Sequence, residues 1–178
     1  MENVHVLVIN GAVGVGKTSV AHVLSDILSE NSIHHAVIDL DALRYAFPRP
    51  PEDQFHMVLG YKNLSAIWKN YRELDIQYFI IPNVVEDLSE VGHIEQAIPG
   101  ANVTVVRLTA PVPTIHNRLR EREKSEKSLN WHLNRAVELS AHLEKMKVED
   151  VVINTENKSV DEVAKEILIK VEWLPQPA

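Results

Sequence analysis

Hydrophobic residues in this chain follow two patterns that alternate along its length. Short runs rich in β-branched residues, typical of buried strands, occur at Val4–Ile9, Ala36–Ile38, Tyr78–Ile81, Val103–Leu108 and Val151–Ile153. The longer stretches between these runs have helical periodicity. Strands that alternate with helices predict an α/β fold, in which a parallel sheet is covered by helices on both faces.

Two helical stretches have the clearest periodicity. Between Glu52 and Leu74, apolar residues recur every three or four positions, at Met57, Tyr61, Leu64, Trp68 and Tyr71. The last predicted helix begins with a capping box, Ser159 and Glu162, and continues with an apolar stripe at Val163, Ile167, Val171 and Leu174. The proline-rich stretch Phe47–Asp53 predicts a stiff connector that also borders a substrate pocket.

The segment after the first predicted strand has the chemistry of a phosphate site. The sequence "GAVGVGKT", Gly11 to Thr18, fits G-x-x-x-x-G-K-S/T between a strand and a helix. Glycines let backbone N–H groups point at a phosphate, and the positive end of the next helix adds to that field. We expect Lys17 to contact the outer phosphates and Thr18 to give a hydroxyl to Mg²⁺. The predicted nucleotide-binding residues are Gly11, Ala12, Val13, Gly14, Val15, Gly16, Lys17, Thr18 and Ser19.

A second motif, "VIDLDALR", places Asp39 and Asp41 at the carboxyl end of the second strand, where α/β sheets bind ligands. In an extended segment both carboxylates would face one cleft. Asp39 would then hold the water shell of Mg²⁺, and Asp41 would orient or deprotonate an acceptor hydroxyl. Arg44, about one helical turn further on, would hold a polar or anionic group of the acceptor. Alternatively, Asp41 merely caps a short helix and Asp39 is a solvated loop acid.

A third motif, "NRLREREK", follows the fourth strand and is predicted to end a helix, with Lys124–Asn130 as a candidate lid. Arg118 and Arg122 share a helix face, and an arginine on a closing lid stabilises charge on a moving phosphoryl group. Both are therefore candidate catalytic residues, ahead of Arg120 and the more distant Arg135. Alternatively, this mixed-charge run is a solvated helix face.

These motifs, together with the final strand-loop-helix "VVINTENKSVDEV", resemble the small P-loop kinases of metabolites and antibiotics. Shikimate kinase, gluconate kinase, adenylylsulfate kinase and chloramphenicol phosphotransferase have similar patterns. The resemblance covers most of the chain and implies a three-layer P-loop NTPase fold, with a five-stranded parallel sheet of order 2-3-1-4-5. It also implies ATP with Mg²⁺, an acceptor site at Asp41, metal-shell water at Asp39, and adenine near Asn154–Ser159. The Asp-x-Asp-x-x-Arg spacing is closest to adenylylsulfate kinase, whose other substrate motifs are not evident.

One position departs from this pattern. Many P-loop proteins carry a carboxylate at the end of a third apolar strand, where this chain has Pro82 and Asn83. Either Asp39 takes over that role or metal binding is weak. Glu86 and Asp87 follow a little downstream, and we expect them on the exposed first turn of the next helix. The alternative is that they contribute to the metal site.

Length and composition set the remaining expectations. A chain of 178 residues supports one hydrophobic core, so we expect a single domain over residues 1–178 with a frayed end at 175–178. We expect no signal peptide and no membrane-spanning segment, because the first residues include an acid and their apolar run is short. The lack of cysteine suits a reducing compartment, so we expect a cytoplasmic protein. A net charge of −7 argues against nucleic acid as a partner. Oligomeric state is not determined by the sequence.

The function predicted from these features is transfer of the γ-phosphoryl group of ATP to a hydroxyl of a small-molecule acceptor. Two alternatives remain open. One is a nucleotide-binding sensor or degenerate kinase without transfer activity, which the missing third-strand carboxylate slightly favours. The other is an NTPase whose acceptor is water or a macromolecule. The residues that select the acceptor are expected within Ala42 to Leu74.

Overall fold

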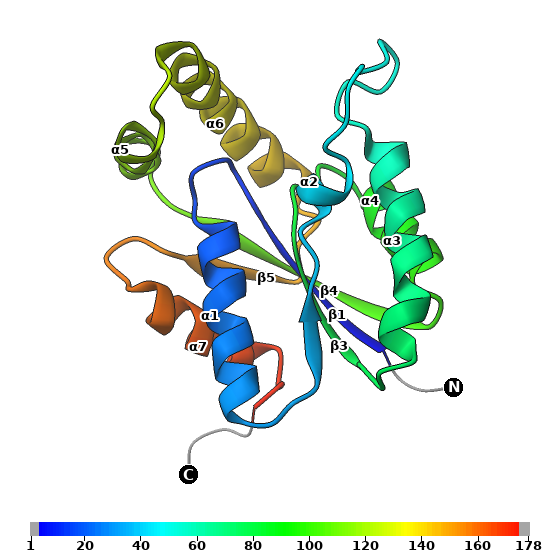
Figure 1. Cartoon of the computed structure of the whole chain (residues 1–178). Coiled ribbons are helices and arrows are strands. Elements are labelled where there is room, and N and C mark those ends of the chain that lie inside the picture. The colour runs from blue at the N-terminus through cyan, green and yellow to red at the C-terminus, as the bar shows by residue number, and fades with distance from the viewer. Residues whose placement is uncertain (1–3, 175–178) are drawn as a thin grey trace.

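Five parallel strands form one sheet in the order β2-β3-β1-β4-β5, as predicted. The computed structural model describes residues 4–174, so the predicted frayed end at 175–178 lies outside the described residues (Figure 1). The strands are close to those predicted, and their bounds are β1 Val4–Gly11, β2 His35–Val37, β3 Tyr78–Pro82, β4 Ala101–Thr109 and β5 Val151–Asn154.

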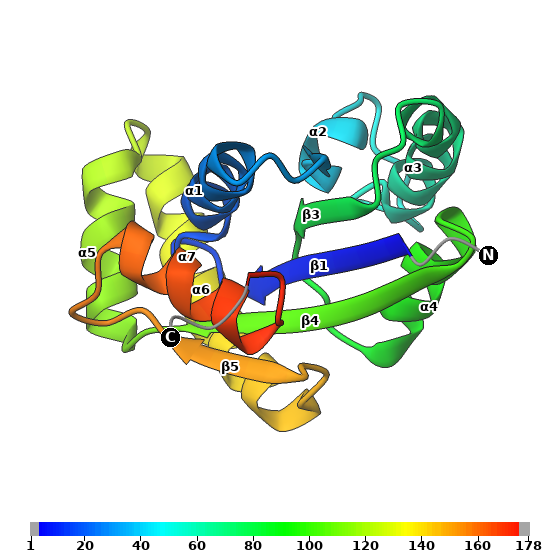
Figure 2. The same cartoon turned by 90° about the horizontal axis from the view of Figure 1, so that it is seen from below.

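Helices cover both faces of the sheet, because side chains along each strand point alternately to opposite faces. Their bounds are α1 Lys17–Glu30, α2 Leu40–Leu43, α3 Met57–Arg72, α4 Leu88–Ala97, α5 Val112–Arg122, α6 Glu126–Met146 and α7 Val160–Lys170. From β1, Val6 and Val8 join the core formed with α3 and α4. Leu7 and Ile9 join the opposite core, formed with α1 and α7, which lie side by side (Figure 2).

The predicted helix over Glu52 to Leu74 is real but shorter, because its start is set by a side chain. The Asp53 carboxylate accepts hydrogen bonds from the backbone N–H groups of Met57 (2.7 Å) and Val58 (3.0 Å), which begin α3. Residues 44–56 therefore form the α2–α3 connection, which contains the predicted stiff segment. Along α3, Leu64 and Trp68 are buried as the stripe predicts. The capping box at Ser159 and Glu162 is also confirmed.

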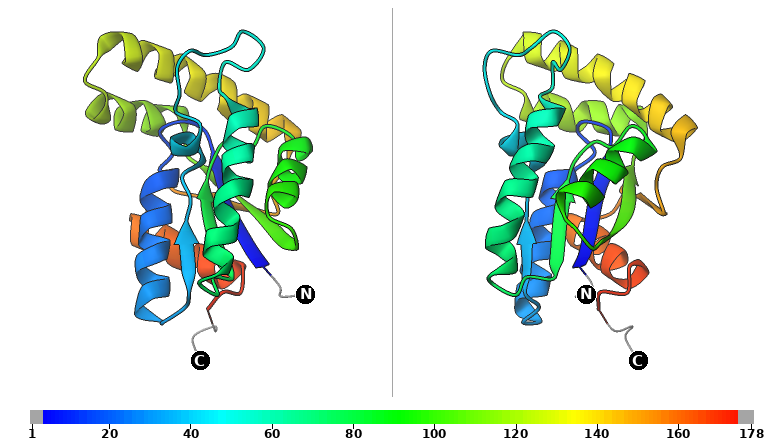
Figure 3. Two further views of the ribbon diagram at one scale, coloured as in Figure 1. Left: turned by 45° about the vertical axis from the view of Figure 1, so that its right-hand side comes forward. Right: turned by 90° about the vertical axis from the view of Figure 1, so that its right-hand side faces the viewer.

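The segment predicted as a lid, Lys124–Asn130, lies at the turn of a helical hairpin that α5 and α6 form. Helix α5 ends at Arg122, but α6 begins at Glu126, so most of Lys124–Asn130 is helix rather than loop. The side chain of Ser125 caps α6 by accepting from the N–H of Ser128. The hairpin stands at the end of the sheet that carries the loop after β1, across from the α2–α3 connection (Figure 3). Within residues 4–174, no helix combines the length and apolarity needed to cross a membrane.

Candidate functional site

The loop between β1 and α1 has the geometry of a phosphate cradle. Gly16 precedes α1 in the left-handed conformation, with φ of 109°, which a residue with a side chain rarely adopts. At Gly11, a Cβ atom would lie 2.6 Å from the carbonyl oxygen of Leu108, so only glycine lets the loop approach β4. The Thr18 and Ser19 side chains are exposed at the start of α1. The predicted strand-loop-helix context is therefore confirmed.

Lys17 folds back over this loop. Its Nζ donates hydrogen bonds to the carbonyl oxygens of Gly11 (2.8 Å) and Ala12 (3.2 Å). Burial lowers the pKa of Lys17 to about 8, against an opposing effect of the nearby Asp41 carboxylate. In this position the ammonium group can bind a phosphate, because phosphate oxygens can replace the carbonyl oxygens of Gly11 and Ala12 as acceptors.

The two aspartates after β2 lie differently from either prediction. The strand ends at Val37, and Asp39 is the N-cap of α2, with its Oδ1 accepting from the N–H groups of Asp41 (2.9 Å) and Ala42 (3.3 Å). The segment is therefore not extended, and the capping residue is Asp39 rather than Asp41. Asp41 lies in the first turn of α2, where its exposed carboxylate accepts a hydrogen bond from Arg44 Nε (2.9 Å). The prediction of an extended segment was wrong because α2 begins at Leu40, and the strand pattern gave no sign of a helix so soon after β2.

Asp41 and Arg44 open onto a pocket of about 510 Å³ that also reaches Lys17. We name it the acceptor-side pocket, and its volume is within the usual range for small-molecule sites. Its wall comes from the phosphate loop and the start of α1, α2, the α2–α3 connection, α3, the segment after β3, α4 and α6. The lining residues are Val13, Lys17, Asp41, Arg44, Arg49, Phe55, Met57, Val84, Glu86, Glu90, Trp131, His132, Arg135 and Leu139.

Arg135 has a more central place than the sequence indicated. It lies in the acceptor-side pocket, where its guanidinium forms an ion pair with Glu86. Glu86 also contacts the ring of His142 through its carbonyl oxygen (3.2 Å). The expectation that Glu86 is merely exposed on a helix turn is therefore wrong, because the residue precedes α4 and faces α6. The spacing of Trp131, Arg135 and Leu139, four residues apart on α6, was the available signal for a shared face.

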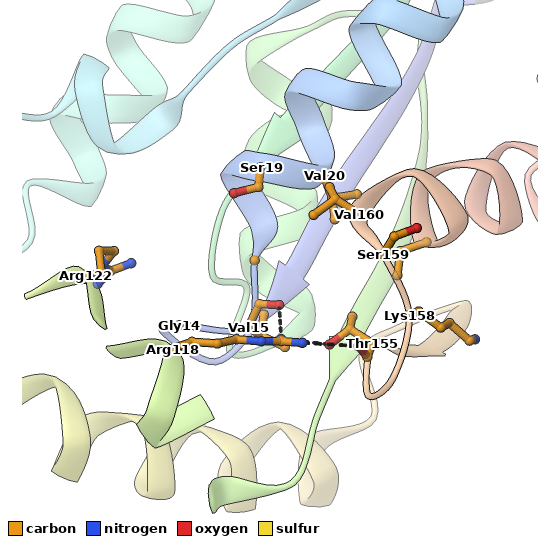
Figure 4. A pocket seen from close by; sticks show the side chains of 12 residues that line it. Gly14, Val15, Ser19, Val20, Arg118, Arg122, Thr155, Lys158, Ser159 and Val160 are labelled. Carbon is orange, nitrogen blue, oxygen red and sulfur yellow. Dashed lines mark hydrogen bonds between the residues drawn. The ribbon is translucent and has the colours of Figure 1, made fainter. Parts of the chain in front are cut away.

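A second pocket, of about 270 Å³, lies on the other side of the phosphate loop, and we name it the nucleotide-side pocket (Figure 4). Its wall includes part of Asn154–Ser159, the loop that the family resemblance places near adenine. The lining residues are Gly14, Val15, Gly16, Ser19, Val20, Arg118, Arg122, Thr155, Lys158, Ser159, Val160 and Val163.

The two candidate lid arginines differ in their surroundings. Arg118 extends across the nucleotide-side pocket and donates to Val15 O (3.1 Å), Thr155 Oγ1 (3.0 Å) and Thr155 O (3.2 Å) (Figure 4). It thus joins the phosphate loop to the β5–α7 loop, unlike a side chain that moves with a lid. Arg122 is half-exposed, donates to the neighbouring Glu123 (2.7 Å), and is close enough for its charge to lower the pKa of Lys17. Of the two, Arg122 is held less firmly to other parts of the fold, because it donates to the adjacent Glu123, whereas Arg118 donates to two separate loops.

Two buried asparagines lie beside the phosphate loop, of which Asn10 was not predicted and Asn83 was noted from the sequence only as a departure from the usual carboxylate. Asn10 Oδ1 accepts from the N–H groups of Gly11 (2.7 Å) and Val85 (3.0 Å), and its Nδ2 donates to Val85 O (2.9 Å). Asn83, directly after β3, is fully buried, and neither polar atom of its side chain has a partner among the described residues. Its backbone N–H donates to Ile9 O (3.1 Å), which places it beside Asn10. No local pattern predicts the role of Asn10, because Val85 is 75 positions away in the sequence.

These side chains fit a hydrated magnesium ion. Mg²⁺ usually keeps several water ligands and takes one or two protein groups together with substrate phosphates. Thr18 would offer its exposed hydroxyl, and Asp39 would meet a metal-bound water through the carboxylate that also caps α2. The Asn83 amide has unused hydrogen-bonding capacity at the strand end where many P-loop proteins place a carboxylate. It would accept a hydrogen bond from such a water without adding charge.

Solved structures share this architecture. The tunicamycin resistance protein of Deinococcus radiodurans is 23% identical, with a TM-score of 0.64 over 99% of this chain and 100% of that one. The APS kinase of Mycobacterium tuberculosis, solved with AMPPNP and APS, is 20% identical, with a TM-score of 0.64 over 97% and 99%. The gluconokinase of Sinorhizobium meliloti is 19% identical, with a TM-score of 0.60 over 97% and 93%.

This chain has the fold of the P-loop small-molecule kinase group. The fold predicted from the sequence, including strand order 2-3-1-4-5, is thereby confirmed. Neither the protein-family models nor the curated protein sequences give a match. At these sequence identities the likeness extends to the fold, and the chemistry has to be argued from the residues of this chain.

Proposed function

We propose that this protein is an ATP-dependent phosphotransferase that moves the γ-phosphoryl group to a hydroxyl of a small molecule. The observation that carries the proposal is the position of the phosphate loop between two pockets. Glycines of the loop line the nucleotide-side pocket, and Lys17 at its end lines the acceptor-side pocket beside Asp41. A nucleotide bound in the first pocket would direct its terminal phosphate toward the second.

Each residue then has a distinct part. The bond from the γ-phosphorus to the bridging oxygen of ADP breaks as a bond forms to the acceptor oxygen, whose proton passes to the Asp41 carboxylate. Arg44 holds that carboxylate by a hydrogen bond and so fixes its orientation. Lys17 and Arg122 stabilise the charge on the transferred group, because positioned cations act strongly in a site that excludes water. Bound Mg²⁺, with Thr18 as its protein ligand, would neutralise phosphate charge.

The test is release of ADP from Mg-ATP by purified protein, with mass spectrometry of each acceptor. The panel contains sugars, sugar acids, nucleosides, shikimate-like polyols and hydroxylated antibiotics, the last group suggested by the name of the tunicamycin resistance protein. Asp41→Asn should lower transfer by at least about a hundredfold while ATP still binds. The matched control is Asp26→Asn, at an exposed position of α1, which should behave as wild type. Unchanged turnover in Asp41→Asn would overturn the role of this carboxylate.

One observation favours a second candidate function, a nucleotide-binding sensor that does not transfer phosphate. Asn83 carries no charge where many P-loop proteins have a carboxylate, which weakens the hold on a catalytic metal ion. Clear ATP binding, with no phosphorylated product from any panel member, supports the sensor. Rapid ATP turnover without any acceptor supports an NTPase instead. A phosphorylated product excludes both alternatives as the main activity.

A further inference from the structure

The charges that line the acceptor-side pocket are mostly neutralised within the protein. Arg44 pairs with Asp41, and Arg135 pairs with Glu86. Lys17 faces the phosphate loop, where it would meet the nucleotide. Among the carboxylates of this pocket, Glu90 on α4 has no cationic side chain within 4 Å in the part of the chain described.

The hydrogen bonds to Glu90 are also incomplete. Its Oε2 accepts from the Tyr61 hydroxyl and its Oε1 from the backbone N–H of Glu86, and both contacts are 3.4 Å long. Contacts of that length are weak, and each carboxylate oxygen retains unused acceptor capacity. Burial raises the pKa of Glu90 to about 6, which leaves the group ionised at neutral pH. A partly buried carboxylate without a cation lacks the compensation that such charges usually find.

Two aromatic side chains line the same pocket from different elements. Phe55 belongs to the α2–α3 connection and is 48% exposed, whereas Trp131 belongs to α6 and is 51% exposed. Met57 also lines the pocket and adds apolar surface to it. Large apolar side chains that stay exposed within a pocket are suited to the flat, apolar part of a ligand.

Resting on the proposed function, we propose that the acceptor is a hydroxylated compound with a flat apolar body and a protonated amine, and that Glu90 binds this amine. Phe55 and Trp131 contact the apolar body, while the hydroxyl lies toward Asp41. Arg49 also lines the pocket, and within residues 4–174 its guanidinium has no carboxylate partner. Arg49 is exposed and keeps its hydration, whereas Glu90 is partly buried and gains more from a ligand of opposite charge. The cationic acceptor is therefore favoured over an anionic one.

The experiment uses matched acceptors that differ in one group. The probes are 2-amino-1-phenylpropane-1,3-diol, its amine-free counterpart 1-phenylpropane-1,3-diol, and the anionic 3-phenyllactate. Phosphoryl transfer from Mg-ATP gives kcat/KM, and calorimetry with a non-hydrolysable ATP analogue gives binding of each probe. The variants are Glu90→Gln and, as the control, Glu95→Gln at an exposed position of the same helix.

Wild type should prefer the amine over the diol by about 10- to 100-fold, the range expected for a hydrogen bond to a charged group. Glu90→Gln should remove most of this preference, and Glu95→Gln should keep it. Matching thermal unfolding of the two variants shows that the change is not a loss of fold.

The outcomes separate this inference from the proposed function. Glu90-dependent binding of the amine without phosphoryl transfer would overturn the kinase activity and leave the ligand assignment standing. Transfer to the amine and the diol at equal rates, or a preference that survives Glu90→Gln, would overturn the assignment of Glu90 and leave the kinase standing. Preference for 3-phenyllactate would assign recognition to Arg49 instead. Failure of all three probes to bind would overturn the acceptor class.

Discussion

Binding of ATP should draw a proton onto Lys17 in alkaline solution. Burial places the pKa of this lysine at about 8, and its Nζ lies against the carbonyl oxygens of the phosphate loop. A polyphosphate beside the amine favours the ammonium form and raises its pKa again. Nucleotide binding is therefore coupled to proton uptake wherever the unliganded lysine is partly neutral.

The size of this uptake follows from the pKa. With a value of about 8, the unliganded lysine is neutral in about 10% of molecules at pH 7, about 50% at pH 8 and about 90% at pH 9. Each ATP should then take up about 0.1, 0.5 and 0.9 protons at these pH values. The nucleotide contributes little, because its terminal phosphate, with a pKa of about 6, is already ionised.

Titration calorimetry in two buffers with different ionisation enthalpies measures the uptake directly. Lys17→Met should remove the pH-dependent part, and Lys69→Met, at an exposed position near the end of α3, should retain it. Uptake below about 0.2 protons at both pH 8 and pH 9 would refute the reasoning.

The same lowered pKa affects the stability of the unliganded protein. Since the folded pKa lies below the ordinary 10.5, the unfolded chain binds more protons between about pH 8 and 10.5, so the contribution of Lys17 to stability rises with pH there.

Three further substitutions test the structure around the site. Arg118→Ala removes three hydrogen bonds, which should lower the free energy of unfolding by about 1–3 kcal/mol and weaken ATP binding about tenfold. Urea denaturation measures the first effect and ATP titration the second. Wild-type values in both assays would contradict the bridging role of Arg118. Asn10→Ala leaves buried backbone groups of Gly11 and Val85 unpaired and should lower the free energy of unfolding by about 3–5 kcal/mol in urea denaturation. A loss under about 1 kcal/mol would show that Asn10 does not stabilise this region. Ser159→Ala removes the N-cap side chain of α7 and should lower the free energy of unfolding by about 1 kcal/mol. An unchanged denaturation midpoint would show that Glu162 alone caps the helix.

Much of the fold follows from local pattern. Runs of β-branched residues gave the strands, and the glycine-rich motif gave the phosphate loop, because both depend on residues adjacent in sequence. The turn after β2 was misjudged, since the Asp39 carboxylate takes the N-cap position and starts a helix where an extended segment was predicted. The shared face of Arg118 and Arg122 was visible in their spacing, but the contact of Arg118 with Thr155 was not.

The acceptor-side pocket was the least predictable part of the site. Arg135 and Glu86 are 49 positions apart, and Glu90 meets Tyr61 across 29 positions. Such contacts arise only when α4 packs against α3 and when α6 approaches the segment after β3, and no spacing rule within one helix reports them. The acceptor-selecting residues were expected within Ala42 to Leu74, yet α6 and the segment after β3 contribute as much of the pocket wall.

The buried amide of Asn10 links the phosphate loop to the wall of the acceptor-side pocket. One side chain holds the first glycine of the phosphate loop and both backbone groups of Val85, which leads into the segment that carries Glu86 and Glu90. Through these hydrogen bonds, a shift of the phosphate loop on binding a nucleotide would reach the wall of the acceptor-side pocket. Because linkage between two sites is reciprocal, a ligand in one pocket would change affinity in the other by the same factor as the second ligand changes affinity for the first.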